Sequence, residues 1–306
     1  MHTDNQTYSR FGFILLVLLT IGWGINWPIM KTVLRDVPPL TFRGICLLGG
    51  GFGILVVARI VGQSLAIPKI YWRKIFLLSL TNIAGWNIFA IYGIGRLPSG
   101  RAALLGYTMP LWSMLLSVWL LNDRMTRRKV GGLALGMAGV FVLMSEGLSA
   151  MSGSLLGVAL MLAAALAWAI GMVLLKRFAL PVPTFTLTGW MMVVIGVPMA
   201  IAAVLLEHGQ WRPISFYPAL GVIYNVFVAF MFCYWAWNRI VLMVPVAVSS
   251  LSSLVTPVIG VVSGALFLHE SIGWHEVAAA ALILGAIRLV LSTPARTDTK
   301  KRVPVA

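Results

Sequence analysis

Charged residues are scarce in this chain. Only 10% of its 306 residues are Asp, Glu, Lys or Arg, whereas 60% are hydrophobic. A soluble domain carries roughly a quarter charged residues, so a domain of this composition would lack the polar surface that keeps it in water. The scarcity excludes an ordinary soluble protein and predicts a helical membrane protein, in which each spanning helix needs ~20 mostly apolar residues.

Cysteine and histidine are also rare. Cys46 and Cys233 both fall within apolar runs, which excludes a disulfide framework and a Cys-x-x-Cys metal site. The chain has four histidines: His2, His208, His269 and His275. They lie in the N-terminal tail, in loops or at the ends of apolar runs, so no Ser–His, Cys–His or His–metal pair is expected at membrane depth. We therefore expect no enzyme, no cofactor and no metal site.

Acidic residues are fewer still, with eight Asp and Glu against 23 Lys and Arg. The net charge of +15 does not indicate a nucleic-acid partner, because the basic residues lie between apolar runs and not on one folded face. No Asp or Glu lies in the middle of an apolar run. This disfavours cation–proton exchange through a buried carboxylate.

Apolar runs dominate what is present, and they predict ten membrane spans. The expected spans are 11–32, 40–61, 74–95, 99–121, 130–148, 154–175, 183–206, 216–238, 245–267 and 274–293. Most of the basic residues then fall on the side of the N-terminus, which places that side in the cytoplasm. We expect a multi-pass protein of the cell inner membrane, with cytoplasmic tails at 1–10 and 294–306 and with membrane lipid around it.

The chain also repeats itself. Matching residues are 145 positions apart early in the repeat and 147 apart later. The pairs include Gly12 and Gly157, Trp23 and Trp168, Lys31 and Lys176, Pro98 and Pro245, Pro110 and Pro257, and Asp123 and Glu270. Each half, 11–148 and 154–293, would hold five spans, and because five is odd the second half crosses the membrane upside down. Inverted repeats are typical of transporters with a substrate site near the midplane.

One motif adds a family resemblance. Residues 22–28, Gly-Trp-Gly-Ile-Asn-Trp-Pro, are followed by Lys31, and with the run 98–123 they resemble the EamA-type members of the drug/metabolite transporter superfamily. The resemblance covers about residues 11–293. It implies an all-α integral membrane fold, ten transmembrane helices in two inverted five-helix repeats, and transport, usually export, of small metabolites such as amino acids. Residues 171–173 are Gly-Met-Val where the first half has Asn-Trp-Pro, so only the first half's polar motif carries over.

Polar and aromatic residues within the spans are the candidate substrate-binding residues. They are Trp23, Asn26, Trp27, Arg43, Asn82, Trp86, Tyr107, Trp168, Tyr224, Trp235, Asn238 and Ser253. Helix packing or an interfacial aromatic belt is the alternative role for each. Arg43, about one turn inside the start of the second span, is the single charged residue that we count as a functional candidate; it either binds a substrate carboxylate or extends to the outer interface.

Helical periodicity ranks the candidates within each span. Trp23, Asn26 and Trp27 share one face of the first span. Tyr224 and Trp235 are 11 residues apart, close to three turns of an α-helix, and so share a face of the eighth. Asn87 and Tyr234, which lie beside these faces, are weaker candidates for substrate contact. Three prolines are candidate hinges, because each leaves a backbone carbonyl unpaired: Pro28, Pro110 and Pro257.

The sequence thus predicts an exporter of small metabolites, with amino acids as the first candidates, that works by alternating access around a midplane cavity. A multidrug, nucleobase or other metabolite exporter is the alternative. A channel is disfavoured because the spans lack rings of charge. The partners expected are a small-molecule substrate and lipid, and the protein is expected to be a monomer or a dimer.

Overall fold

The computed structural model of the chain describes residues 10–121, 127–149, 153–178, 180–237, 256 and 259–291. Within these ranges the chain forms helices and connecting turns and has no strand. Seven of the described helices are long and apolar enough to cross a membrane, and three shorter apolar helices accompany them. The expected all-helical membrane fold is confirmed, while ten spans in inverted repeats stay a prediction.

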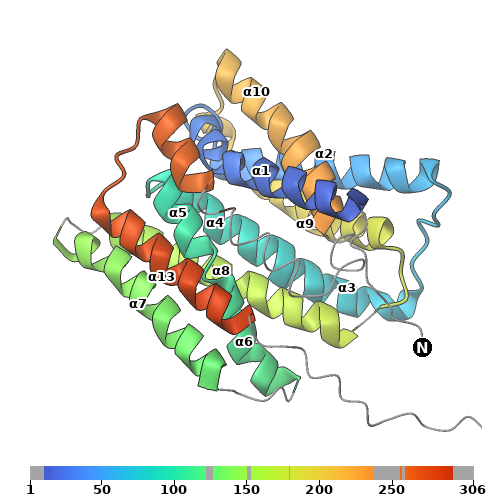
Figure 1. The fold of residues 1–306 in the computed structure, drawn as a ribbon. Helices are drawn as coiled ribbons and strands as arrows, with labels where there is room; N and C mark the ends of the chain where they lie inside the picture. Colours follow the sequence, from blue (N-terminus) through green and yellow to red (C-terminus); the bar gives the residue numbers. More distant parts are fainter. Residues whose placement is uncertain are drawn as a thin grey trace, which may run out of the picture.

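The helices follow the predicted spans closely (Figure 1). Those of the first half are α1 (Arg10–Val33), α2 (Pro39–Ile60), α3 (Trp72–Leu78), the π-helix η2 (Ser79–Gly85), α4 (Trp86–Ile94), α5 (Ser99–Gly106), α6 (Met109–Leu120) and α7 (Arg127–Ser149). Those of the second half are α8 (Gly153–Phe178), α9 (Thr184–Glu207), α10 (Phe216–Tyr224), the π-helix η4 (Asn225–Cys233), the helix Ile259–Leu268 and α13 (Trp274–Leu291).

Two helix pairs join the halves of the chain. α2 packs along α9, and α7 packs along α13 at one edge of the molecule (Figure 1). Glycine permits the close approach of α2 and α9, since a Cβ built on Gly44 would lie 3.2 Å from the Cα of Ala200. Small residues at a helix interface are typical of membrane bundles, where van der Waals packing drives association.

The remaining helices surround the centre of the bundle. α4, α5 and α6 contact α8, while α1 contacts α10 and η4. The helix Ile259–Leu268 lies between α1 and α5, since Cβ atoms built on Gly24 and Gly100 would meet Ile259 and Val261. Outward-facing surfaces are apolar, with Leu205 72% and Phe216 70% exposed, as a lipid-facing surface requires.

Three of the predicted spans are not continuous α-helices. The third and eighth each contain a π-helical segment, η2 and η4. The fourth is interrupted at Tyr107 and Thr108, between α5 and α6, with Pro110 in the first turn of α6. α1 continues through Pro28. The carbonyl of Gly24, which Pro28 leaves without its helical donor, accepts a long 3.4 Å hydrogen bond from Ser263 Oγ.

Candidate functional site

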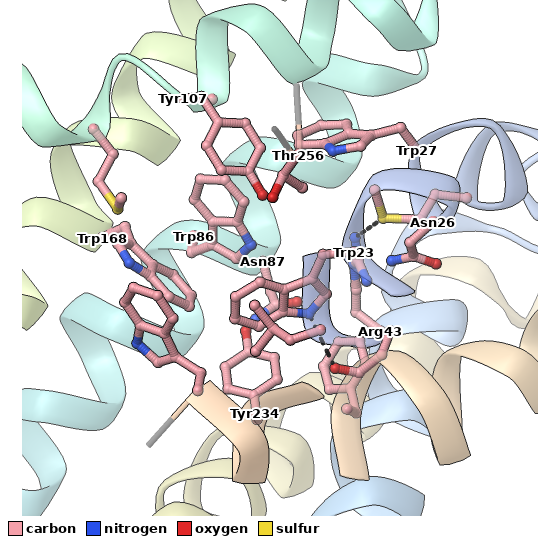
Figure 2. Close-up of a pocket in the computed structure, with 17 residues that line it drawn as sticks. Trp23, Asn26, Trp27, Arg43, Trp86, Asn87, Tyr107, Trp168, Tyr234 and Thr256 are labelled. Carbon is pink, nitrogen blue, oxygen red and sulfur yellow. Dashed lines mark hydrogen bonds between the residues drawn. The ribbon is translucent and has the colours of Figure 1, made fainter. Parts of the chain in front are cut away.

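A cavity lies at the centre of the bundle, where α1, α2, α4, α5, α8 and the end of the eighth span meet. We call it the central pocket (Figure 2). It is lined by Leu19, Trp23, Asn26, Trp27, Met30, Arg43, Trp86, Asn87, Gly106, Tyr107, Met109, Trp168, Ala229, Phe230, Tyr234, Trp237 and Thr256. Its volume of about 80 Å³ compares with ~10–15 Å³ for one water by the same measure, so it has room for roughly 5–8 non-hydrogen atoms.

Six aromatic rings form a continuous wall of this pocket: Trp23, Trp27, Trp86, Tyr107, Trp168 and Tyr234. The ring centroids of Trp86 and Trp168 are 5.1 Å apart, and those of Trp23 and Tyr234 are 5.7 Å apart. Both pairs meet edge to face, the arrangement that the ring quadrupoles favour. The wall is therefore stiff, and it offers ring faces to an apolar or cationic group.

Arg43 supplies the charge of the central pocket. Its side chain is only 2% exposed, so it does not extend to the outer interface. The guanidinium carbon lies 5.6 Å from the ring centroid of Phe230, and Nε has no hydrogen-bond partner within the part of the chain that the structure describes. No Asp or Glu is among the described residues that line the pocket. Arg43 is thus a desolvated cation with no counter-ion among these lining residues, an arrangement that costs free energy unless a ligand supplies the negative charge.

Two asparagines supply unpaired acceptors. Asn26 and Asn87 are 6% and 1% exposed, and Oδ1 of each has no hydrogen-bond donor among the described residues. The Asn87 Nδ2 donates to the carbonyl of Ile83 at 2.9 Å, which holds that side chain in place. Buried polar atoms without partners are rare in native proteins and call for an explanation. A bound ligand with N–H groups would satisfy both oxygens.

The structure brings most of the predicted site residues together. Seven line the central pocket: Trp23, Asn26, Trp27, Arg43, Trp86, Tyr107 and Trp168. They come from α1, α2, α4, α8 and the break after α5, and so from both halves of the chain. Asn238, Ser253 and the hinge candidate Pro257 lie outside the described residues.

Three predicted residues lie elsewhere in the described structure. Asn82 packs against Gly171, the Tyr224 hydroxyl donates to the Gly22 carbonyl at 2.8 Å, and Trp235 stacks on Phe185 with ring centroids 5.5 Å apart. The expected faces assumed 3.6 residues per turn. Since η2 contains Asn82 and η4 precedes Trp235, the wider i→i+5 hydrogen bonding of these segments rotates both residues out of that register. Tyr224 precedes η4, and its hydroxyl is held by the Gly22 carbonyl.

The same rotation explains which lining residues the sequence did not rank highly. Asn87 and Tyr234 were placed beside the predicted faces, yet they line the pocket, as does Trp237. The cluster of aromatic and amide residues in the third and eighth spans was the available signal. Leu19, Met109, Ala229 and Phe230 carry no such signal, because apolar residues are common throughout the chain.

Comparison with known proteins agrees with this architecture. The EamA-like transporter family matches the chain twice, over residues 10–145 and 155–292. The uncharacterized transporter YvbV of Bacillus subtilis is 31% identical over 285 residues, 90% of each chain. A probable amino-acid metabolite efflux pump of Salmonella typhimurium is 28% identical over 289 residues, 91% of this chain and 94% of that protein.

A solved structure extends the agreement to the fold. A crystal structure at 21% sequence identity matches with a TM-score of 0.68, over 92% of this chain and 97% of that one. At this identity the likeness concerns the fold alone. The two family matches together span nearly the whole chain, and the chain therefore belongs to the EamA-like transporter family, a family of membrane transporters.

Proposed function

We propose that this protein exports small zwitterionic metabolites, amino acids first among them, by alternating access around the central pocket. The observation that carries the proposal is the pairing of an uncompensated Arg43 with unpaired amide oxygens on Asn26 and Asn87. A carboxylate would neutralise the guanidinium, and an ammonium group would donate to the amide oxygens. The aromatic wall would also attract the ammonium through its ring faces.

Two further observations support this substrate class. Relatives from Salmonella typhimurium and Escherichia coli, at 28% and 26% identity, are named probable amino-acid metabolite efflux pumps. The pocket volume of about 80 Å³ is close to what a small amino acid fills, at ~10–15 Å³ for each water-sized group. A large drug would need a wider pocket than this conformation has.

Alternating access follows from the proposed inverted repeat. The family matches each half separately. The contacts between helices also follow the same pattern when each span is replaced by its counterpart in the other half. The second span packs on the seventh and the fifth on the tenth, as α2 on α9 and α7 on α13. Spans one and eight pair as α1 with α10 and η4, and spans six and three pair as α8 with α4. Motion of these groups about the pocket would open it to each side in turn.

The excess of basic residues on one side supports an orientation with both termini in the cytoplasm and the protein in the cell inner membrane. With that orientation, the ends of α1 and α9 and the start of α5 lie at the outer face. Inner-membrane transporter relatives support this location.

A nucleobase or planar drug exporter is the second candidate, and the aromatic wall favours it, because flat rings stack on indole faces. The two candidate functions differ in whether the substrate must carry a carboxylate. Uptake of amino acids into vesicles by exchange should depend on Arg43 and on the substrate carboxylate. Nucleobase exchange should depend on neither.

Efflux from proteoliposomes tests the proposal. Purified protein is reconstituted, the vesicles are loaded with a mixture of labelled amino acids, and the loss of each is followed over time. We expect efflux of at least one small amino acid above protein-free vesicles, and loss of that efflux in Arg43→Gln. Absence of amino-acid flux, together with nucleobase flux in the same vesicles, would replace the first candidate by the second.

A further inference from the structure

One carboxylate joins three helical segments at a single end of the bundle. Glu270 follows the helix Ile259–Leu268. Its Oε1 lies 2.9 Å from Lys31 Nζ at the end of α1, and its Oε2 lies 2.7 Å from Ser99 Oγ at the start of α5. The backbone N–H of Ser99 donates to both carboxylate oxygens at 2.9 Å. We call these contacts the Glu270 clamp.

The clamp lies directly beyond the central pocket. Lys31 adjoins Met30, which lines the pocket, and the helix between Ile259 and Leu268 runs from the pocket region to Glu270. That helix is tightly packed on α5, since a Cβ built on Gly260 would lie 2.8 Å from Ala103. A Cβ built on Gly260 would also lie 3.2 Å from Trp27, which lines the pocket, so the clamp fastens a segment that packs beside the pocket wall.

Three ion pairs between described residues lie at this end of the bundle: Lys31–Glu270, Arg101–Glu276 and Arg212–Asp36. The first two connect α1 or α5 of the first half with the segment from Glu270 to Glu276 of the second half. These are the elements that must separate if the pocket is to open at this end.

The charged groups of Lys31 and Glu270 can move apart without a large desolvation cost. The side chains of Lys31 and Glu270 are 32% and 15% exposed, so water can replace their contacts. Burial alone would raise the pKa of Glu270, but hydrogen bonds from Ser99 and Lys31 outweigh it and hold the pKa below its usual value. The carboxylate is therefore ionised at neutral pH and makes reversible contacts of a strength suited to a gate.

The pair α2–α9 behaves differently. Glu207 accepts hydrogen bonds from Leu40 N and Thr41 N at one end, and Trp190 Nε1 donates to the Leu65 carbonyl at the other. Leu65 lies in the segment that follows α2, so contacts near both ends hold α2 and α9 together, and we expect this pair to stay together during transport. Glu207 is thus a glutamate with similar contacts, at the same end of the bundle, that joins α9 to the start of α2 and not to the clamp.

We infer that the Glu270 clamp is the lock of the outer gate, and that its release exposes the central pocket to the outer face. The inference rests on the proposed alternating-access export, and it assigns Glu270 and Lys31 as positioning residues of the transport cycle. In this inference, the clamped state is the one in which the central pocket is closed to the outer face.

Cysteine accessibility tests the lock without any substrate. The reporter is Ala229→Cys, which places a thiol in the pocket wall, in a chain whose buried Cys46 and Cys233 are replaced by alanine. A membrane-impermeant maleimide is added to the outer face of right-side-out vesicles. We expect slow modification in the reporter chain and about tenfold faster modification after Glu270→Gln, the size of effect expected when a charge-assisted contact is lost.

Two variants complete the test. Lys31→Gln should accelerate labelling as Glu270→Gln does, and it serves if Glu270→Gln fails to insert. Glu207→Gln should leave the rate within about twofold of the reporter chain, because it loosens a pair that does not open. Equal rates in all chains, or equal acceleration by Glu207→Gln and Glu270→Gln, would overturn the inference.

The same experiment separates the lock from the proposed function. Faster labelling of Glu270→Gln, together with no amino-acid efflux by the parent protein, would support the gate and contradict the assignment of amino acids as substrates. Amino-acid efflux with unchanged labelling would keep the exporter and remove the gate. Rapid labelling of the unlocked and locked chains alike would show that the outer end is open at rest, which contradicts the clamp.

Discussion

The guanidinium of Arg43 lies 2.8 Å from the sulfur of Met30, measured from Nη2 to Sδ, at the wall of the central pocket. A thioether is a weak and neutral acceptor, so this contact does not balance the charge. The Phe42 ring, with its centroid 5.1 Å from the guanidinium carbon, adds only a cation–π attraction. The central pocket therefore holds a poorly compensated cation, and a substrate carboxylate is the group that would compensate it.

Replacing Arg43 by an apolar residue should raise the stability of the protein and lower its transport rate. We expect Arg43→Met to raise the unfolding temperature of the detergent-solubilised protein by at least about 2 °C, because replacing an unpaired buried charge by an apolar side chain of similar length removes a desolvation cost. The same variant should lose carboxylate transport by at least about tenfold, the equivalent of 1.4 kcal/mol. Thermal unfolding and vesicle efflux measure the two effects.

Arg59→Met is the matched control, since Arg59 is an exposed arginine near the other end of α2. It should change neither quantity appreciably. Normal efflux in Arg43→Met would remove the role given to the guanidinium.

The fold was largely predictable because hydrophobic length alone locates membrane helices. The expected first and second spans, 11–32 and 40–61, differ by one residue at each end from α1 and α2. Charge placement and matching residues add an orientation and an inverted repeat, and both stay predictions. None of these signals depends on tertiary contacts, which is why they can be read from one sequence.

The site was predictable only where helices stay regular. Trp23, Asn26 and Trp27, expected on one face of the first span, all line the pocket, since α1 keeps its period through Pro28. Asn82 and Trp235 were expected in the pocket, but they lie outside its lining because π-helical turns precede or contain them. A π-helical segment has no reliable sequence signature, so the rotation it causes appears only in the structure.

The narrow pocket predicts a strong size effect at Gly106. A Cβ built there would lie 3.1 Å from Trp27 and 3.2 Å from Trp86. Both rings belong to the stiff aromatic wall, so the extra methyl groups of Gly106→Val would occupy the pocket. We expect efflux to fall at least about tenfold, a barrier of 1.4 kcal/mol, while the protein still inserts and purifies. Efflux assays and size-exclusion profiles of the variant give these readouts.

Gly209→Val makes the same substitution where nothing lies within 4 Å of the new Cβ. It should transport like the parent chain. Full activity in Gly106→Val would mean that substrate does not pass beside Trp27 and Trp86.

The Glu270 clamp predicts how stability changes with acid. Because hydrogen bonds from Ser99 and Lys31 lower the pKa of Glu270 in the folded protein, the clamp stabilises the fold fully above the unfolded pKa of about 4.3. Its contribution is lost as the pH falls through the lower, folded pKa. The difference in unfolding temperature between the parent and Glu270→Gln should therefore be constant from about pH 8 to 5 and shrink below about pH 4.

A difference that shrinks between pH 8 and 6 would mean that Glu270 is protonated near neutrality, which contradicts the hydrogen bonding described. Glu207→Gln, followed over the same range, shows how much of any acid effect is general to carboxylates at this end.

The orientation of the chain predicts opposite accessibility for two exposed positions. Gly209 lies at the end of the bundle that carries Glu207, and Ala66 lies in the exposed segment after α2 at the other end. With the termini in the cytoplasm, Gly209→Cys should react with an impermeant maleimide added outside intact cells, and Ala66→Cys should react only in inverted vesicles. The buried Cys46 and Cys233 should give little background. The reverse pattern would mean that the protein has the opposite orientation in the membrane, and the Glu270 clamp would then lie at the inner face. Labelling of both positions from one side would contradict the odd number of spans between them, which an inverted repeat requires.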